Sequence, residues 1–180
     1  MNFDKQNTLS ERSKAILHNP SRLELIARLG LFSDEARSAL KRYTRSAARR
    51  MNLPVSLISL VLHDSQYFAA SYGLDPDLFD GASGTPIEWS FCRFAVEERR
   101  AFVVCDAMND SRVKGNPLVL SGMIGCYAGA PLISSFGLVL GTLCVIGTEP
   151  RLFQEGEIDR LRGLADVAMQ EIELSNFGEN

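Results

Sequence analysis

The 180-residue chain has few of the residues that metal binding, membrane insertion or secretion requires. It has two histidines, and its four cysteines form no C-x-x-C pair, so the ligand spacing of a metal site is absent. No segment approaches the ~18 consecutive apolar residues of a membrane helix. The N-terminal residues MNFDKQNTLSERSK contain no apolar run behind a basic start, so we expect no secretory signal. We therefore expect a cytoplasmic protein with free thiols, no bound metal and no membrane contact.

A strong charge of either sign is also lacking. The net charge is −3, so the chain has no basic field with which to bind nucleic acid. Six basic residues do lie close together, and we interpret them as the solvated face of a helix. They are Arg37, Lys41, Arg42, Arg45, Arg49 and Arg50. With 46% hydrophobic residues, the chain can bury one core of ordinary size without disulfides.

Helix signals occur near both ends of the chain. Asn19-Pro20 predicts a helix start, because Asn accepts N–H bonds at the N-cap and Pro suits the first helical position. Ser33 predicts a second start, and apolar residues recur at spacings of three and four over residues 36–51. Helical periodicity also runs through residues 158–172, which predicts a long C-terminal helix.

Five apolar segments between these helices predict strands. They cover residues 55–62, 67–72, 101–104, 125–132 and 138–146. A short helix is expected over residues 89–98, and loops over 80–86 and 106–121. Two pairs of strands are joined by short turns, so the sheet is at least partly antiparallel, and the terminal helices can cover it.

Four segments carry a family resemblance. They are SFCRFAV (90–96), VVCDAMNDSRVKGNPLV (103–119), CYAGAPL (126–132) and LGTLCVI (140–146). In this order and spacing they resemble the bacterial signalling branch of the GAF domain family. The resemblance implies an α+β fold with a central antiparallel β-sheet of about five to six strands, flanked by helices on both faces. We accordingly expect a GAF domain over residues 19–176, a flexible or helical extension over 1–18 and a tail over 177–180.

The resemblance also implies a function. GAF domains act as sensory or regulatory modules in signal transduction, often by binding a small molecule, and the family alone does not name that molecule. Two positions depart from the family pattern, because Gly147 stands where many relatives have Asp and Cys105 where Pro often precedes the Asp-Ala pair. Most relatives are joined to an output module. None is visible here, so we expect a stand-alone domain that acts in trans on a signalling partner and is not an enzyme.

Several candidate ligand-binding residues lie in the predicted helix over 89–98 and in the last two strands. Trp89, Phe91 and Tyr127 would supply apolar and aromatic lining, with plain core packing as their alternative role. Thr142 would add a hydroxyl group from the last strand. Cys92 follows Phe91 in the short helix and is the one thiol that we single out for reactivity.

The predicted loop over 106–121 supplies polar candidates. Arg112 is expected to hold an anionic group of the ligand bidentately. Asp106 and Asn116 would orient the ligand or hold the loop. The alternative is that the Asp and Asn residues of this segment only form turns and caps.

Two other functions remain open at this stage. A cysteine-dependent redox protein of the same fold, either a free methionine sulfoxide reductase or a redox sensor, would need a thiol of lowered pKa and a second thiol within reach. Against it, Cys126 and Cys144 lie in predicted strands, where a small buried residue is usual. The third hypothesis is a ligand-free dimerisation or interaction module. Bilin and haem are not expected, because neither His18 nor His63 follows a cysteine or falls in the pocket segments.

The C-terminal helix also predicts an assembly. Val167, Met169 and Leu174 leave apolar area outside its main stripe. Because closed two-fold pairs are the commonest assemblies, we expect a homodimer built on the terminal helices.

Overall fold

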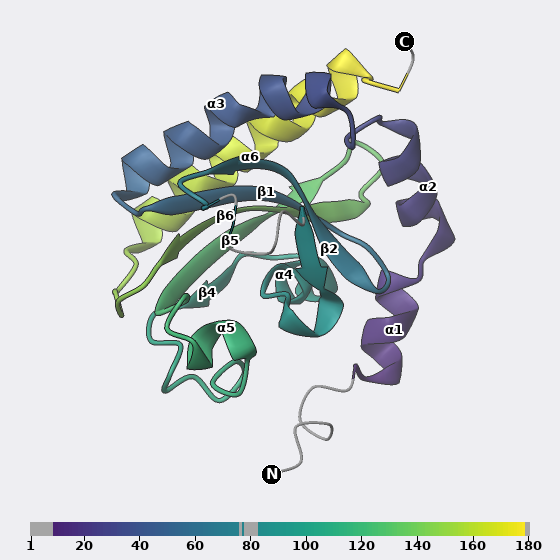
Figure 1. The fold of residues 1–180 in the computed structure, drawn as a ribbon. Coiled ribbons are helices and arrows are strands. Elements are labelled where there is room, and N and C mark those ends of the chain that lie inside the picture. The colour runs from purple at the N-terminus through teal and green to yellow at the C-terminus, as the bar shows by residue number, and fades with distance from the viewer. Residues whose placement is uncertain (1–8, 76, 78–82, 179–180) are drawn as a thin grey trace.

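The computed structural model describes residues 9–75, 77 and 83–178, and its centre is one six-stranded antiparallel sheet (Figure 1). The strand order is β3-β2-β1-β6-β5-β4. The strands are β1 (Val55–Val61), β2 (Ser65–Tyr72), β3 (Gly84–Pro86), β4 (Phe102–Val104), β5 (Cys126–Ile133) and β6 (Val139–Gly147). The helices are α1 (Glu11–Leu17), α2 (Pro20–Arg28), α3 (Asp34–Met51), α4 (Cys92–Glu98), α5 (Pro117–Leu120) and α6 (Glu155–Ser175), with a 3-10 turn η2 (Ile87–Trp89). The predicted α+β fold is confirmed.

The helix starts follow the capping signals in the sequence. The Asn19 side chain accepts a hydrogen bond from the backbone N–H of Arg22, and Ser33 does the same for Ala36. Both predicted N-caps are confirmed. The helix α3 ends at Met51, and its C-cap Asn52 adopts the left-handed conformation that closes many helices.

The sheet has two differently covered faces. The long helices α3 and α6 lie side by side across one face, as Figure 1 shows, and pack on Ile58, Leu143 and Val145 among others. Because side chains alternate along a strand, Leu57 and Cys144 point to the opposite face, toward α4 and α5. The described residues therefore form two apolar clusters, and the candidate site lies in the one beneath α4.

The N-terminal segment packs into this second cluster. Leu17 of α1 is fully buried there. Arg22 of α2 is buried as well, and its guanidinium donates hydrogen bonds to the backbone carbonyls of Leu17 and Val61. Burial lowers the pKa of Arg22 to about 10, so the side chain stays charged at neutral pH. The helix α1 is thus tied to the sheet through α2, while residues 1–8 of the predicted extension lie outside the described residues.

Three details differ from the predicted elements. Residues 84–86, expected in a loop, form the edge strand β3. A Cβ at Gly84 would lie 2.0 Å from the Gln66 carbonyl oxygen, so only glycine allows this close pairing. The predicted helix over 89–98 is divided into η2 and α4. The predicted tail begins with Phe177, which is buried against the α3–α6 side of the core. Residues 80–82 of the predicted loop lie outside the described residues.

None of the helices in the described ranges has both the length and the hydropathy needed to cross a membrane.

Candidate ligand-binding site

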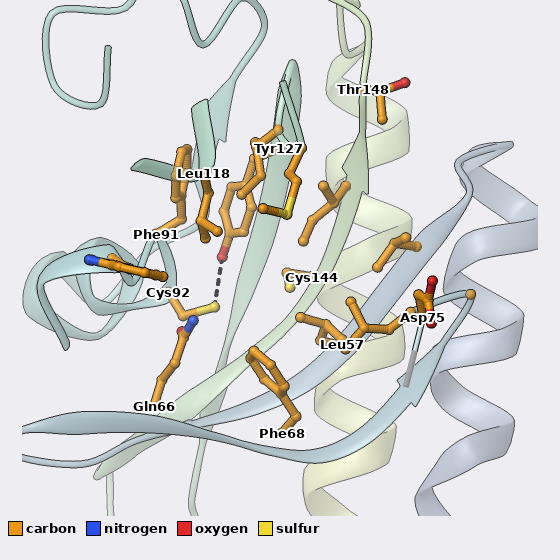
Figure 2. A pocket seen from close by; sticks show the side chains of 17 residues that line it. Leu57, Gln66, Phe68, Asp75, Phe91, Cys92, Leu118, Tyr127, Cys144 and Thr148 are labelled. Carbon is orange, nitrogen blue, oxygen red and sulfur yellow. Dashed lines mark hydrogen bonds between the residues drawn. The ribbon is translucent and has the colours of Figure 1, made fainter. Parts of the chain in front are cut away.

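A cavity of about 260 Å³ lies between the second face of the sheet and the segments that cross it (Figure 2). Its walls come from β1, β2, β5 and β6 of the sheet and from η2, α4 and α5 above it. The lining residues are Val55, Leu57, Gln66, Phe68, Gly73, Leu74, Asp75, Trp89, Phe91, Cys92, Leu118, Met123, Ile124, Tyr127, Cys144, Ile146 and Thr148. Asp75 and Thr148 are exposed and mark the mouth, whereas Cys92 and Gln66 are buried at the other end.

Gln66 holds the inner end of the cavity in place. Its Oε1 accepts hydrogen bonds from Ser90 Oγ at 2.7 Å and Ser59 Oγ at 3.2 Å, and its Nε2 donates to Thr85 Oγ1 at 2.7 Å. Ser90 Oγ also accepts from the backbone N–H of Arg93 at the start of α4. The Ser90 side chain therefore links α4 to the sheet and sets the position of Cys92, two residues later.

Tyr127 forms the opposite wall at this end. Its hydroxyl donates a hydrogen bond to Cys92 Sγ at 3.2 Å, and its ring centroid lies 5.2 Å from that of Phe91. Gly129 makes this placement feasible, because a Cβ there would lie 2.2 Å from the Tyr127 hydroxyl oxygen. The Tyr-Ala-Gly sequence of β5 thus lets a tyrosine lie along its own strand and point at Cys92.

The ionisation of Cys92 is shifted by its surroundings. Burial raises the pKa of the thiol, but hydrogen bonds that Cys144, Thr142 and Tyr127 can donate to the thiolate outweigh burial and lower it to about 6. Thr142 Oγ1 is fully buried and makes no hydrogen bond of its own to the described residues, so its O–H is free to turn toward a thiolate.

Cys144 and Tyr127, which both interact with Cys92, have pKa values that are shifted in the opposite direction. Hydrogen bonding to Cys92 and burial raise the pKa of Cys144 well above its ordinary value. Burial, together with the nearby cysteines, raises the pKa of Tyr127. Cys144 and Tyr127 therefore remain protonated at neutral pH, and Cys92 is the group of this cluster that ionises most readily.

The cavity contains little other charge. Among the lining residues that the structure describes, Asp75 at the mouth is the only carboxylate and no side chain is basic. In the described ranges, no three side chains come together that could hold a metal ion. The site is an apolar chamber in which Gln66, Cys92 and Tyr127 present the polar atoms, which suits a small molecule with few hydrogen-bonding groups.

Comparison with known families decides the classification. The family described as GAF domain matches residues 35–172. The chain belongs to the GAF domain family. A Pseudomonas aeruginosa protein named cyclic di-GMP phosphodiesterase is 37% identical to this GAF domain over 154 residues. The match covers 84% of the chain but 25% of that protein, so the chain spans about a quarter of the length of this relative.

Solved structures show the same fold at low sequence identity. The GAF domain of an Acinetobacter phosphoenolpyruvate-protein phosphotransferase aligns with a TM-score of 0.63 at 17% identity, covering 93% of this chain and 96% of that chain. A type II free methionine-R-sulfoxide reductase from Thermoplasma acidophilum aligns with a TM-score of 0.62 at 13% identity, covering 78% and 94%. These likenesses establish the architecture of this GAF domain and carry no ligand or activity over to it.

Four of the eight residues predicted for the site line the cavity of this GAF domain. They are Trp89, Phe91, Cys92 and Tyr127. Thr142 lies on the same face of β6, two residues before Cys144, but is not one of the residues that line the cavity. The structure therefore brings together the aromatic residues and the thiol that the sequence suggested.

The polar candidates of the segment 106–116 lie outside the lining. The Arg112 guanidinium donates to Asp110 at 2.9 and 2.5 Å and to the Val103 carbonyl at 3.0 Å. Its side chain is 48% exposed, and the ion pair with Asp110 raises its pKa. Because Arg112 is outside the cavity and already paired, its predicted role as an anion clamp has no support in this geometry.

Asp106 and Asn116 form local structure. Asp106 accepts hydrogen bonds from the backbone and side-chain nitrogens of Asn109 in an exposed turn. Asn116 caps α5 through the Leu118 N–H, and its side chain donates to the Trp89 carbonyl at 3.0 Å. The Asn116 bridge joins α5 to η2 and so shapes the wall of the cavity without lining it.

The sequence reasoning missed the floor of the cavity. Leu57, Phe68 and Ile146 lie in strands that were predicted, but they were not assigned to the site. Alternation along β1 and β6 separates the two faces and could have grouped these residues. It does not say which face lies beneath the short helices, since both faces are apolar.

Proposed function

We propose that this GAF domain binds a small, largely apolar molecule in the cavity and that binding regulates a signalling partner. One observation supports this most directly: a cavity of about 260 Å³ opens at Asp75 and ends at hydrogen-bonded polar groups. Its volume is near the small end of ligand pockets, which span ~300–1,000 Å³. The similarity to part of a protein named cyclic di-GMP phosphodiesterase supports a place in bacterial signalling.

The charges of the cavity favour an uncharged or cationic ligand. Among the described lining residues, an anionic group would meet Asp75 at the mouth and the readily ionised Cys92 at the inner end, and no basic side chain that could pair with it. Burying an unpaired charge is costly, so phosphate-bearing molecules fit this site poorly. We therefore infer that the molecule bound is not a nucleotide.

A matched pair of substitutions tests the site. Ile146 lines the cavity, whereas Ile133, at the end of the neighbouring strand, is 36% exposed and does not. Ile146→Phe should fill the cavity, and Ile133→Phe should leave it open. Native mass spectrometry of freshly purified protein detects a retained ligand, and calorimetry with indole, an uncharged aromatic probe, measures binding. We expect retained mass or saturable indole binding in wild type and Ile133→Phe, and about tenfold weaker binding or none in Ile146→Phe.

Circular dichroism and thermal unfolding control for folding of both variants. Equal indole binding by Ile146→Phe and Ile133→Phe would place the ligand outside this cavity. A wild-type protein that neither retains a ligand nor binds indole would favour the ligand-free interaction module.

A cysteine-dependent redox enzyme is the second candidate, because Cys92 and Cys144 both line the cavity. Free methionine sulfoxide is a zwitterion, however, and its carboxylate would find no basic partner among the lining residues that the structure describes. We propose that the domain does not turn it over. An assay of thiol-dependent sulfoxide reduction should give no rate above that of the Cys92→Ser variant, and turnover lost in that variant would establish the enzyme instead.

A further inference from the structure

We propose that Cys92 is a covalent binding site for small, uncharged α,β-unsaturated carbonyl compounds, a proposal that rests on the cavity admitting ligands as described under Proposed function. The cavity then serves to detect electrophiles, with the Cys92 thioether as the bound state.

The geometry gives Cys92 selective access. Its side chain is 3% exposed, yet it lines the inner end of the cavity (Figure 2). Sγ therefore meets molecules that enter past Asp75 and is shielded from larger reagents. The apolar walls formed by Leu57, Phe68 and Leu118 would pack the carbon skeleton of an entering molecule.

The neighbours of Sγ favour its nucleophilic form. Tyr127 donates to Sγ at 3.2 Å, and Thr142 holds a buried hydroxyl with no hydrogen-bond partner among the described residues. A thiolate accepts such hydrogen bonds better than a thiol does, so both hydroxyls stabilise the form that attacks carbon. The unpartnered hydroxyl of Thr142 is thereby explained as a group that pairs when Cys92 is ionised.

The other cysteines lack this combination. Burial raises the pKa of Cys126, and hydrogen bonding to Cys92 together with burial raises that of Cys144. Cys105 is half-buried but does not line the cavity. If solvent exposure alone set reactivity, Cys105 would be the first thiol to react. Preferential reaction at Cys92 therefore distinguishes the proposed site from a reaction governed by exposure.

The covalent step balances without an oxidant. Sγ attacks the β-carbon, a C–S bond forms, and the C=C π electrons move onto the carbonyl oxygen as an enolate. The proton that ionisation removed from the thiol returns to the α-carbon, which restores the carbonyl group. The elements of S–H have then added across C=C. Tyr127 acts as a positioning residue, because its hydroxyl donates a hydrogen bond to the attacking sulfur.

N-ethylmaleimide is an uncharged probe of this chemistry, and 3-maleimidopropionic acid is its anionic counterpart. Intact-mass spectrometry with peptide mapping on the full chain, at limiting reagent, identifies the thiol modified first. We expect N-ethylmaleimide to modify Cys92 before Cys105. The anionic reagent should lose this preference, because the described part of the lining offers no basic partner for its carboxylate.

Measuring the rate of modification over a range of pH distinguishes the reactivity of a Cys92 thiolate from the accessibility of the thiol alone. The pKa of Cys92, about 6, means that its thiolate fraction falls less than about twofold from pH 7 to pH 6, whereas that of an ordinary thiol falls about tenfold. The rate of modification at Cys92, divided by that of N-acetylcysteine in the same solution, should therefore rise about fivefold when the pH is lowered from 7 to 6. Tyr127→Phe should slow the reaction and move its pH midpoint upward, which a loss of packing alone would not do.

Three outcomes would overturn the proposal: wild-type Cys105 modified first by N-ethylmaleimide, Cys92 modified only after unfolding, or a constant rate relative to N-acetylcysteine between pH 7 and pH 6. The wild-type mapping does not depend on any variant being able to fold.

Indole binding without modification of Cys92 would overturn this proposal and leave the proposed function standing, whereas failure of both measurements would overturn both. Ile146→Phe, with Ile133→Phe as control, should slow modification at Cys92 and leave Cys105 unchanged.

Discussion

Cys92 shows how the chemistry of one residue is set by residues distant in the sequence. The chain positions it by Ser90, two residues earlier, which hydrogen-bonds to Gln66. Its ionisation is set by Tyr127, Thr142 and Cys144, which arrive from β5 and β6. A cysteine between a phenylalanine and an arginine would otherwise be an ordinary thiol.

The ionisation of Cys92 should make the stability of the protein depend on pH. Its pKa in the folded state, about 6, lies below the value of 9.0 for an ordinary thiol, so the unfolded chain binds more protons between these values. The stabilisation is fully present above pH 9 and is lost as the pH falls through 6. Chemical denaturation at pH 6 to 9 should show the unfolding free energy of wild type rising relative to Cys92→Ser, by at most about 1.4 kcal/mol per pH unit.

Cys126→Ser is the control for this measurement. Burial raises the pKa of Cys126, so both states hold its proton below pH 8 and no slope is expected from it. A flat difference between wild type and Cys92→Ser would show that the folded thiol titrates like the unfolded one.

At the scale of elements, short and long helices are held by different means. The four-residue helix α5 is too short to be stable on its own and depends on Asn116, which caps it and ties it to η2. The long helices α3 and α6 are held by their apolar stripes against the sheet and by a hydrogen bond from Tyr43 to Glu171 at 2.5 Å. The short elements thus shape the cavity, while the long ones form the opposite layer.

The outer face of α6 is suited to self-association. Val167 is 51% exposed and Leu174 is 87% exposed, and Gly163 adds open space one turn before Val167. A two-fold partner could place the same apolar stripe against this one. We expect a homodimer by light scattering at tens of micromolar, and a monomer for Leu174→Glu, because a buried unpaired carboxylate is costly.

Leu120→Glu is the matched control for the dimer. Leu120 is 54% exposed on α5, on the other side of the sheet, so this variant should remain dimeric. A monomeric wild-type protein, or a Leu174→Glu variant that still dimerises, would remove α6 from the interface.

At the scale of the whole molecule, much of the architecture was predictable. The helix starts at Asn19 and Ser33 follow from capping chemistry, and five of the six strands follow from apolar runs. The edge strand β3 was missed because three residues, two of them Gly84 and Pro86, carry no alternation. Its pairing with β2 depends on the close backbone approach that glycine permits.

The candidate site was predictable only in part, because the sequence does not say which side chains come into contact after folding. Local patterns are enough to predict the family and the fold, because periodicity, caps and the Ser-Phe-Cys and Tyr-Ala-Gly segments each lie within a short stretch of chain. The folded arrangement alone shows that Arg112 pairs with Asp110 outside the cavity and that the Tyr127 hydroxyl reaches Cys92, 35 residues away. Such pairings depend on the distance between side chains after the sheet and helices have packed. Spacing along the chain does not encode that distance.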